Sequence, residues 1–358
     1  MNPKLIINLF KLRTNLDRLV DRCHAVGIKT AIVTKVFCAD ERICRMISES
    51  EADAFADSRV QNLAAIAELH SDKPTQLLRI SMQSEVEDVV RYADISMQSE
   101  KETIRLIGGA AKKLGKVHKI ILMVDMGDLR EGIFNTDEAQ IFSAAEAILA
   151  EPALEFHGIG VNLTCYGGII PDETNLGGLL AIADKLHKRY SVPLPIVSGG
   201  NSSMLTMLEE NRIPEGITQL RLGESFVLGN NTESGKPVEW LNTDCFTLEA
   251  ELVEVQRKPS KPIGTSGLNA FGERVTFEDR GEMIRGILAI GRQDVNPDGL
   301  TPLDPDVEII GASSDHLIVN LTNCKKYKVG DTLRFIPDYG ALLKLTTSKY
   351  VHREYAEQ

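Results

Sequence analysis

The chain has 358 residues, 43% of them hydrophobic and 25% charged, and a formal net charge of −11. This size and composition predict a globular protein with two domains. The acidic residues are spread along the chain, so nucleic acid and anionic membranes would be repelled and neither is expected as a partner. Six scattered cysteines without a C-x-x-C pair, and the lack of an apolar run of transmembrane length, predict reduced thiols and a cytoplasmic location.

From about residue 28 to residue 230, short apolar runs alternate with amphipathic stretches such as Glu100–Leu114, Asp137–Ala150 and Glu173–Tyr190. The short runs are typical of parallel strands that are buried on both faces. The expected strands are Thr30–Phe37, Ala52–Ala56, Gln76–Ile80, Ile95–Met97, Lys119–Val124, Phe156–Leu163, Leu194–Val197 and Gln219–Leu222. Eight such alternations predict an N-terminal (β/α)8 barrel over residues 1–230, with a doubly wound open sheet as the alternative.

The pattern changes after about Gly229. The segment Thr232–Lys236 is polar, and the runs FTLEAELVEVQ, MIRGILAIG, VEIIGASSDHLIVNL and GDTLRFI that follow are strand-like and separated by turn residues. We therefore expect a C-terminal all-β domain over residues 231–358, with the first ten or so residues of the chain pairing with it.

Catalytic groups of a (β/α)8 barrel lie at the C-terminal ends of its strands, and the first expected strand ends in VTKVF. Lys35 is thus placed late in an apolar run. A buried lysine is costly unless its pKa falls or it is covalently modified, and either state makes it a Schiff-base nucleophile. The alternative is a lysine whose ammonium group reaches the rim of the barrel.

Charged and polar residues also follow the fifth and sixth expected strands. Arg130 in VDMGDLREGIF could bind a substrate carboxylate or a cofactor oxygen, or it could belong to a surface cluster of ion pairs. In GVNLTCYGG, Asn162 and Cys165 precede a glycine turn. Because no histidine is close to Cys165 in the sequence, we expect a buried structural thiol there.

The last two expected strands end in motifs that are typical of phosphate sites. In PIVSGGNSSML, Asn201 and Ser202 open a helix whose free N–H groups could bind an anion, although these residues could equally be N-caps. In LRLGESFVLG, Arg221 points inward or outward according to strand parity, and Gly223 allows close approach of a ligand. A lysine facing a phosphate site across a barrel mouth indicates pyridoxal phosphate.

The motifs VTKVFCA, VDMGDLREGI, SGGNSS and RLGESFVLG occur in the order seen in fold-type III pyridoxal-phosphate enzymes, and the chain resembles the alanine racemase family. The longer strings IVTKVFCAD, FADSRVQNL, GVNLTCYG and SSDHLIVNL resemble its ornithine racemase branch. The resemblance implies a racemase of ornithine or another basic amino acid that uses pyridoxal phosphate. It also implies a homodimer whose sites are shared between subunits.

The resemblance also implies roles for individual residues. Lys35 resembles the lysine that carries the cofactor and acts as the base on one face of the α-carbon. Arg221 resembles the arginine on the pyridine nitrogen, and Arg130 the arginine near the phenolic oxygen and the substrate carboxylate. The remaining expected cofactor contacts are Asn162, Asn201, Ser202, Gly223 and Tyr350, with Tyr339 as an alternative to Tyr350.

The sequence departs from the family pattern at the second base. The family places a partner-subunit tyrosine in the stretch that reads KPIGTSGLNAFG here, and this stretch contains no tyrosine. The candidates to replace it are Asp315 with His316, Cys165, Tyr166, and the hydroxyls of Thr265 and Ser266. Asp315 with His316 is the candidate pair for the catalytic site, because a histidine titrates in the required range. A lone histidine in a strand is more often a structural residue, so the sequence leaves the second base open. For a basic substrate, Asp128 or Glu131 would bind the side-chain ammonium.

Two other functions are compatible with the resemblance. One is a lyase or dehydratase of the same fold type; such enzymes depend on a metal, and we find no grouping of His, Cys and Asp in the β domain, so no metal is expected. The other is a cofactor-homeostasis protein that binds pyridoxal phosphate without turnover. Proteins of that kind resemble the barrel alone.

Overall fold

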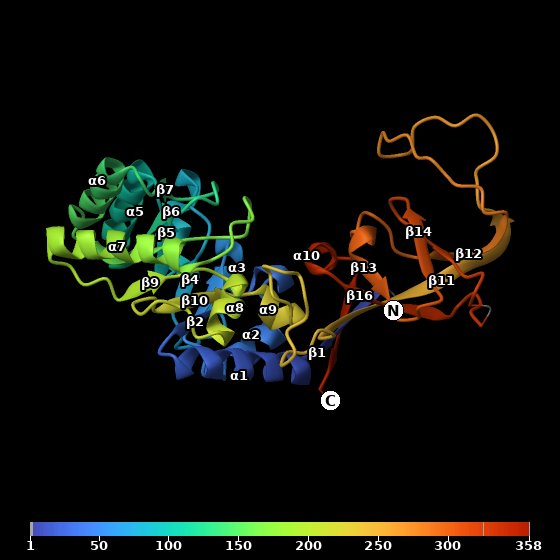
Figure 1. Ribbon diagram of the computed structural model, residues 1–358, viewed down its shortest axis with the longest axis horizontal. Coiled ribbons are helices and arrows are strands. Elements are labelled where there is room, and N and C mark those ends of the chain that lie inside the picture. The colour runs from blue at the N-terminus through green and yellow to red at the C-terminus, as the bar shows by residue number, and fades with distance from the viewer. Residues whose placement is uncertain (1–2, 325, 358) are drawn as a thin grey trace. The chain divides into compact units, whose positions relative to one another are not determined.

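The computed structural model describes residues 3–324 and 326–357, so the outermost residues of both expected domains lie outside the description. The chain forms two compact units (Figure 1): Leu12–Thr243 is one, and the residues up to Lys11 form the other together with those from Asp244 onward. The boundary therefore falls later than the expected residue 230. The reason is packing, because the Asn242 backbone bonds the Asn15 side chain and Arg22 stacks on the Trp240 ring at 4.1 Å.

The first unit is a closed barrel of eight parallel strands. Its strands are β2 (Lys29–Val33), β3 (Ala54–Asp57), β4 (Thr75–Leu77), β5 (Ile95–Gln98), β6 (His118–Asp125), β8 (Leu154–Gly160), β9 (Ile196–Ser198) and β10 (Gln219–Leu222). The order is β5-β4-β3-β2-β10-β9-β8-β6, and pairing of β5 with β6 closes the barrel. The expected (β/α)8 barrel is confirmed and the open sheet is excluded. A short strand, β7 (Ile133–Phe134), also pairs with β6.

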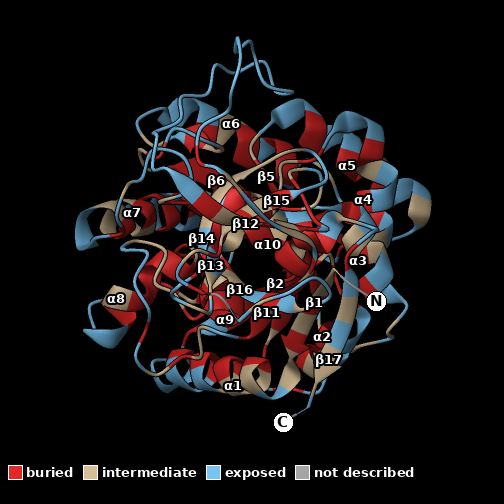
Figure 2. Ribbon diagram, turned by 90° about the vertical axis from the view of Figure 1, so that its right-hand side faces the viewer, coloured by how far each residue is buried: buried red, intermediate tan, exposed pale blue. Residues whose placement is uncertain are grey.

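Helices cover the outside of the barrel, with buried residues on their inner sides and exposed residues on their outer sides (Figure 2). The α-helices are α1 (Leu9–Ala25), α2 (Glu41–Ser48), α3 (Val60–Ala67), α4 (Val86–Tyr92), α5 (Lys101–Leu114), α6 (Glu138–Leu149), α7 (Glu173–Tyr190), α8 (Leu205–Glu209) and α9 (Glu224–Leu228). Short 3₁₀ turns are η1 (Lys35–Phe37), η2 (Gln83–Glu85) and η3 (Ser202–Met204). Among the described residues, no helix combines the length and apolarity needed to cross a membrane.

Strand register decides which residues face the barrel interior. Arg221 is paired with Ala31 and Gln219 with Ser198, so these residues share the inner face of the sheet. The inner face carries two apolar clusters, one of Ile95, Met97, Ile121, Met123 and Ile196 and one of Ala31, Val33, Ala54 and Ala56. The barrel interior is therefore apolar on one side, while Ser198, Gln219 and Arg221 make it polar beneath the ends of β9 and β10.

The second unit is built on antiparallel strands, as expected. Its strands are β1 (Lys4–Asn8), β11 (Phe246–Pro259), β12 (Glu282–Leu288), β13 (Leu300–Pro302), β14 (Glu308–Ala312), β15 (Leu317–Asn320), β16 (Thr332–Pro337) and β17 (His352–Ala356). Strand β1 pairs antiparallel with β11 and parallel with β17. The unit is not purely β, because α10 (Tyr339–Thr347) follows β16 and is capped by Asp338, which accepts the Ala341 N–H at 2.7 Å.

Candidate active site

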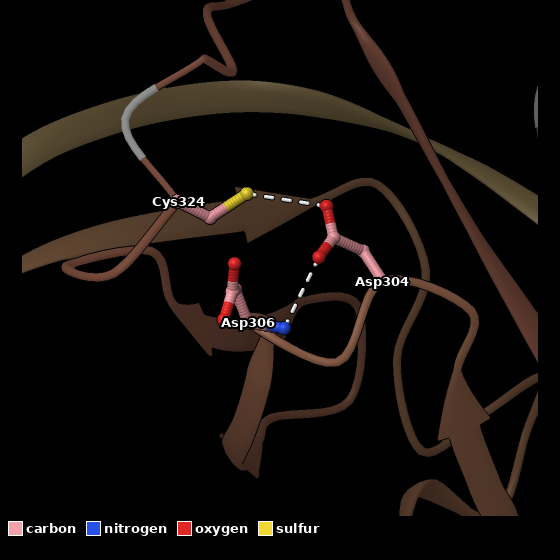
Figure 3. Close-up of side chains that lie close together, drawn as sticks. All are labelled: Asp304, Asp306 and Cys324. Atoms are coloured by element: carbon pink, nitrogen blue, oxygen red, sulfur yellow. Dashed lines mark hydrogen bonds between the residues drawn. The ribbon is translucent and has the colours of Figure 1, made fainter.

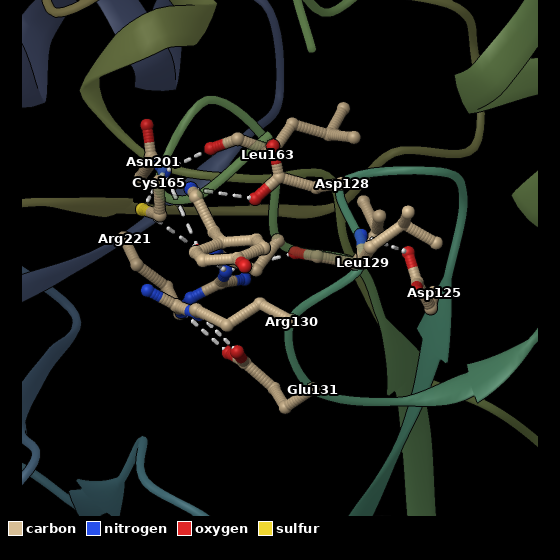
Figure 4. A network of polar contacts seen from close by, with 12 residues as sticks. Asp125, Asp128, Leu129, Arg130, Glu131, Leu163, Cys165, Asn201 and Arg221 are labelled. Atoms are coloured by element: carbon tan, nitrogen blue, oxygen red, sulfur yellow. Dashed lines mark hydrogen bonds and ion pairs between the residues drawn. The ribbon is translucent and has the colours of Figure 1, made fainter. Parts of the chain in front are cut away.

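The C-terminal ends of the barrel strands bring the expected site residues of the barrel together. Lys35 follows β2, Arg130 follows β6 and Asn162 follows β8. Asn201 and Ser202 follow β9, Arg221 lies within β10, and Gly223 comes directly after β10. Figure 4 shows Arg221, Arg130, Asn201 and Cys165 in one network of polar contacts, together with the acidic residues of the loop after β6.

Lys35 does not lie in a strand. Strand β2 ends at Val33, and Lys35 begins the turn η1, where it is half-buried. The turn ends in two residues with left-handed backbone, Cys38 and Ala39, with φ values of 51° and 48°. Such φ values are uncommon for residues with a Cβ, so the surrounding structure holds this turn in a single conformation.

A buried carboxylate supports the turn from below. The Thr34 hydroxyl donates to the Asp57 carboxylate at 2.5 Å, and the Arg59 N–H and the Asn62 amide donate to the same group. Burial raises the pKa of Asp57, while these hydrogen bonds and the charge of Lys35 act in the opposite direction. Sequence reasoning missed Asp57, although its position at the end of the apolar run AFA was a usable signal.

Arg221 points into the barrel. Its guanidinium donates to Ser198 Oγ at 2.6 Å, to the Val161 carbonyl at 2.8 Å and to Asn162 Oδ1 at 3.4 Å. Burial lowers the pKa of Arg221 to about 10, against the opposing charges of Glu131 and Cys165. The guanidinium therefore keeps its proton at neutral pH and offers only donors.

The loops after β9 and β10 join through the Ser202 hydroxyl. Ser202 Oγ accepts the backbone N–H groups of Gly223 at 3.3 Å and Ser225 at 3.1 Å, and it shares a hydrogen bond with Ser225 Oγ at 2.9 Å. A Cβ on Gly223 would lie 3.1 Å from the Val33 Cβ, directly below the Lys35 turn. The expected phosphate loops therefore pack closely against the end of the lysine strand.

The Asn162 and Asn201 side chains meet above Arg221. Asn201 Nδ2 donates to the Leu163 carbonyl at 2.8 Å, to Cys165 Sγ at 3.3 Å and to Asn162 Oδ1 at 3.4 Å. The expectation of a buried structural thiol at Cys165 is wrong: this residue is exposed. The chain turns outward after Asn162 through Thr164, whose φ of 67° is left-handed, and this brings the thiol out of the core.

Two charged groups on the loop after β6 have different partners. Arg130 forms an ion pair with Glu131, with Nη2 and Oε1 2.6 Å apart. Burial opposes the charge of Arg130, but the hydrogen bond and charge of Glu131 outweigh it and raise the pKa of Arg130. Asp128 is 1% exposed and accepts the backbone N–H groups of Tyr166 and Ile169. Asp128 thus holds the loop through these hydrogen bonds, and its expected binding of a substrate ammonium stays a prediction.

Asp315, His316 and Tyr350 belong to the second unit. Asp315 and His316 form an exposed turn between β14 and β15, where Asp315 accepts a hydrogen bond from the Ser314 hydroxyl at 2.9 Å. Tyr350 follows α10 and is 52% exposed. Tyr339, the alternative to Tyr350, is the first residue of α10. The expected site roles of these residues stay predictions.

The second unit also contains a group of metal-type ligands that sequence reasoning missed. Asp304, Asp306 and Cys324 place one ligand atom each within 4.8 Å of the others (Figure 3). The fold brings them together from two separate loops, which is why the sequence shows no grouping. The Asp304 carboxylate already binds Lys326 at 2.7 Å and the Tyr327 hydroxyl at 2.9 Å. The Lys326 ammonium holds the pKa of Asp304 low and already neutralises the charge of this carboxylate.

The barrel site fits pyridoxal phosphate on the chemistry of its free donors. Within the described residues, the buried Asn162 Nδ2 and Ser203 Oγ have no hydrogen-bond partner. Unpaired buried polar atoms are costly, and a ligand with phosphate and ring acceptors would satisfy them. Arg221 supplies a permanent donor, and Lys35 lies in the turn that follows the adjoining strand, since β10 pairs with β2.

Comparisons with known proteins identify the family of this chain. A sequence model described as "Alanine racemase, N-terminal domain" matches residues 7–230. The chain is 48% identical to an ornithine racemase of Acetoanaerobium sticklandii, over 99% of both chains. It is 38% identical to a lysine racemase of Thermotoga maritima, over 99% of this chain and 98% of that one.

A solved alanine racemase from Clostridium difficile 630 has the same fold. The two structures superpose with a TM-score of 0.75 at 16% sequence identity, and the match covers 100% of this chain and 96% of that one. Alanine racemases act on amino acids with pyridoxal phosphate as cofactor. With a family model that matches residues 7–230 and two full-length relatives, this chain belongs to the alanine racemase family.

Proposed function

We propose that this protein is a pyridoxal-phosphate-dependent racemase of basic amino acids, with ornithine as the first substrate to test. The observation that carries the proposal is the 48% identity to an ornithine racemase over 99% of both chains. The position of Lys35 directly after β2, beside the strand β10 that carries Arg221, supports it, because racemisation needs an amine beside a fixed cofactor ring.

Each end of the cofactor has a partner in this proposal. Lys35 would bind its aldehyde carbon, and Arg221 would donate to the ring nitrogen, with Asn162 at its side. Ser202, the Gly223 N–H and Asn201 would hold the phosphate, with Tyr350 as a further contact. When bound, pyridoxal phosphate supplies the electron withdrawal that makes the α-proton of an attached amino acid removable. Arg221, with a pKa of about 10, would keep that nitrogen unprotonated at neutral pH.

The Arg130–Glu131 ion pair is proposed to bind the two charged ends of a basic substrate. A substrate carboxylate that takes over Arg130 would leave the Glu131 carboxylate to bind the side-chain ammonium. Glu131→Gln should therefore lower kcat/KM for ornithine more than for norvaline, which has the same chain length without the terminal amine. An equal loss with both substrates would contradict this role.

The functional unit is proposed to be a homodimer. The segment 261–281 is an irregular excursion between β11 and β12 (Figure 1), and its apolar side chains are exposed: Ile263 by 90%, Leu268 by 66% and Phe271 by 45%. Apolar groups so exposed are typical of contact surfaces, and a second copy of the chain is the proposed partner. Sedimentation should give twice the chain mass of 39.4 kDa, and Leu268→Asp with Ile263→Asp should shift it to the monomer.

The activity test uses single enantiomers. Purified holoenzyme should convert L-ornithine, L-lysine or L-arginine to a mixture of both enantiomers, measured by chiral chromatography, with no loss of total amino acid. Release of a keto acid would instead support a lyase or dehydratase. No change with any amino acid would support a cofactor-homeostasis protein.

The cofactor test uses Lys35. After borohydride treatment of the holoenzyme, peptide mass spectrometry should find a pyridoxyl group on Lys35. The Lys35→Ala protein should lose both the label and the visible absorbance band. A label on another lysine would contradict the assignment.

A further inference from the structure

Racemisation, which is the proposed function on which this inference rests, needs proton carriers on both faces of the α-carbon. Lys35 stands at the end of β2. On one side of the closed barrel only β10 and β9 separate β2 from β8, and four strands separate them on the other. A group on the loop after β8 therefore reaches the barrel mouth from a different side than Lys35. Cys165 is on that loop.

The thiol of Cys165 is connected to Arg221 through one side chain. Its sulfur lies 3.6 Å from Asn162 Oδ1, and Arg221 Nη2 donates to the same oxygen at 3.4 Å. Asn201 Nδ2 donates to the sulfur from the other side at 3.3 Å. Figure 4 shows the sulfur beside Asn201, on the same side of the network as Arg221. An amide donor and a nearby guanidinium are the surroundings in which a thiol becomes a useful acid and base.

Two arginines respond to charge at this sulfur. The charge of Cys165 contributes to raising the pKa of Arg130, and it opposes the effect of burial on the pKa of Arg221. Both guanidinium groups are therefore close enough to the Cys165 side chain to interact with it. The Asn162 side chain that Cys165 contacts is 7% exposed, and its Nδ2 has no partner among the described residues. The thiol therefore lies beside a buried donor that a bound ligand could satisfy.

The other cysteines have different surroundings. Burial raises the pKa of both Cys23 and Cys245 to about 12, and it also raises the pKa of Cys44. Cys324 is bonded to Asp304 in the second unit. Of the six cysteines, only Cys165 is exposed.

We propose that Cys165 is the second proton carrier of the reaction. For one enantiomer the thiolate takes the α-proton and becomes a thiol, and the electron pair of the broken C–H bond stays with the α-carbon. The Lys35 ammonium then gives a proton to the opposite face and becomes an amine. The reverse direction uses the Lys35 amine as the base and the Cys165 thiol as the acid.

The test separates the two faces by hydrogen exchange. In D₂O, Cys165→Ala holoenzyme should racemise ornithine at least about a hundredfold more slowly, the usual scale for loss of an acid–base group. It should still exchange the α-hydrogen of the one enantiomer that Lys35 deprotonates, with retention of configuration, as followed by NMR. Cys165→Ser should behave similarly and checks that the loss is not caused by misfolding.

Two further variants and one control make competing outcomes visible. Tyr166→Phe removes the neighbouring hydroxyl on the same loop, and His316→Gln removes the titratable ring expected from the sequence; each tests a competing proton carrier. Asp184→Asn changes an exposed carboxylate of α7 and should racemise within about twofold of the parent, less than 0.5 kcal/mol. Racemisation that survives Cys165→Ala would overturn the proposal, and its loss in Tyr166→Phe or His316→Gln would identify the carrier instead. Equal loss of exchange from both enantiomers in folded Cys165→Ala and Cys165→Ser proteins would also overturn the proposal.

A second readout does not depend on turnover. Iodoacetamide should alkylate Cys165 of the holoenzyme at pH 7 faster than Cys38, as mapped by peptide mass spectrometry, and saturating ornithine should protect it. If Cys165 reacts no faster than Cys38, the proposal is wrong even if the protein is a racemase. If the parent racemises no basic amino acid, the proposed function fails by itself and this comparison still judges the thiol.

Discussion

The carboxylate of Asp128 accepts a hydrogen bond from the backbone N–H of Tyr166 at 3.0 Å, across two loops that follow neighbouring strands of the barrel. The same carboxylate binds the Ile169 N–H at 3.2 Å, and the Asp128 carbonyl accepts the Gly167 N–H at 3.1 Å. These three bonds join the loop that carries Arg130 to the loop that carries Cys165. The mouth of the site therefore depends on a buried side chain that holds two loops together.

Asp128→Asn should lower the free energy of unfolding and slow the proposed racemisation. The amide turns a donor toward one backbone N–H, and leaving a buried donor unpaired costs about 1–3 kcal/mol. Urea unfolding at neutral pH should show this loss. Asp184→Asn, on the exposed face of α7 in an ion pair with Lys188, is the matched control and should change stability by less than about 0.5 kcal/mol. Equal effects of the two substitutions would contradict the role given to Asp128.

Arg221→Lys should lower the activity strongly, although the substitution keeps the positive charge. A lysine keeps the charge but cannot reach Ser198 Oγ, the Val161 carbonyl and Asn162 Oδ1 together, because it lacks the planar fork. We expect a fall in kcat/KM of at least about tenfold, or ~1.4 kcal/mol, with weaker retention of the cofactor on dialysis. Arg212→Lys changes an exposed arginine bound to Glu173 and Glu210 and serves as the control. Retained activity in the Arg221 variant would contradict the prediction.

Glu249 should make the second unit sensitive to acid. It is 5% exposed in β11 and bonds Lys4 of β1 and Arg334 of β16, and these bonds hold its pKa below the ordinary value against the effect of burial. A depressed carboxylate pKa stabilises the folded state above the unfolded pKa of about 4.3, and this contribution is lost as the pH falls through the folded value.

Glu249→Gln tests this dependence. Compared with the parent, the variant should be less stable at pH 7 by about 1–3 kcal/mol, and the difference should shrink toward pH 3. Urea unfolding at both pH values measures it. A difference that is independent of pH would show that packing, and not charge, accounts for the loss.

Thr34→Val should weaken the support of the Lys35 turn in a way that depends on pH. Without the Thr34 hydroxyl, the buried Asp57 carboxylate loses a donor, so the pKa of Asp57, already raised by burial, should rise further. A raised carboxylate pKa penalises the folded state above that pKa, and the penalty is relieved when the group is protonated. The loss of about 1–3 kcal/mol should thus be larger at pH 8 than at pH 5.

A second threonine serves as a control, because it shows what the loss of a hydroxyl does where no buried carboxylate is involved. Thr347→Val removes an exposed hydroxyl that bonds only backbone carbonyls of α10. This substitution should change the free energy of unfolding by a small amount that does not vary with pH. If Thr34→Val behaves in the same way, Asp57 does not support the turn as described.

The arrangement of the barrel was predictable because it is repeated in the sequence. Each buried parallel strand must be apolar on both faces, so runs such as Ile95–Met97 and Gln219–Leu222 stand out from the helices between them. The observed strands differ from the expected ones at their ends, most importantly at Lys35. Propensity cannot locate the point where an apolar run leaves the sheet, because VTKVF suits a strand and a buried turn equally well.

The β/α alternation, the β domain and the candidate cofactor lysine could be predicted from the sequence, since hydrophobic period and motif order are local properties of the chain. Closure of the barrel through the pairing of β5 with β6 is seen only in the folded structure. The folded structure was needed to show that the Arg221 side chain faces inward to Ser198 and that Asp128 accepts backbone N–H groups. It also shows that Cys165 is exposed beside Asn201. Strand register and loop packing decide those contacts, and both depend on residues far apart in the chain. A side chain's chemistry can be read from its type, but its partners exist only after the barrel has closed.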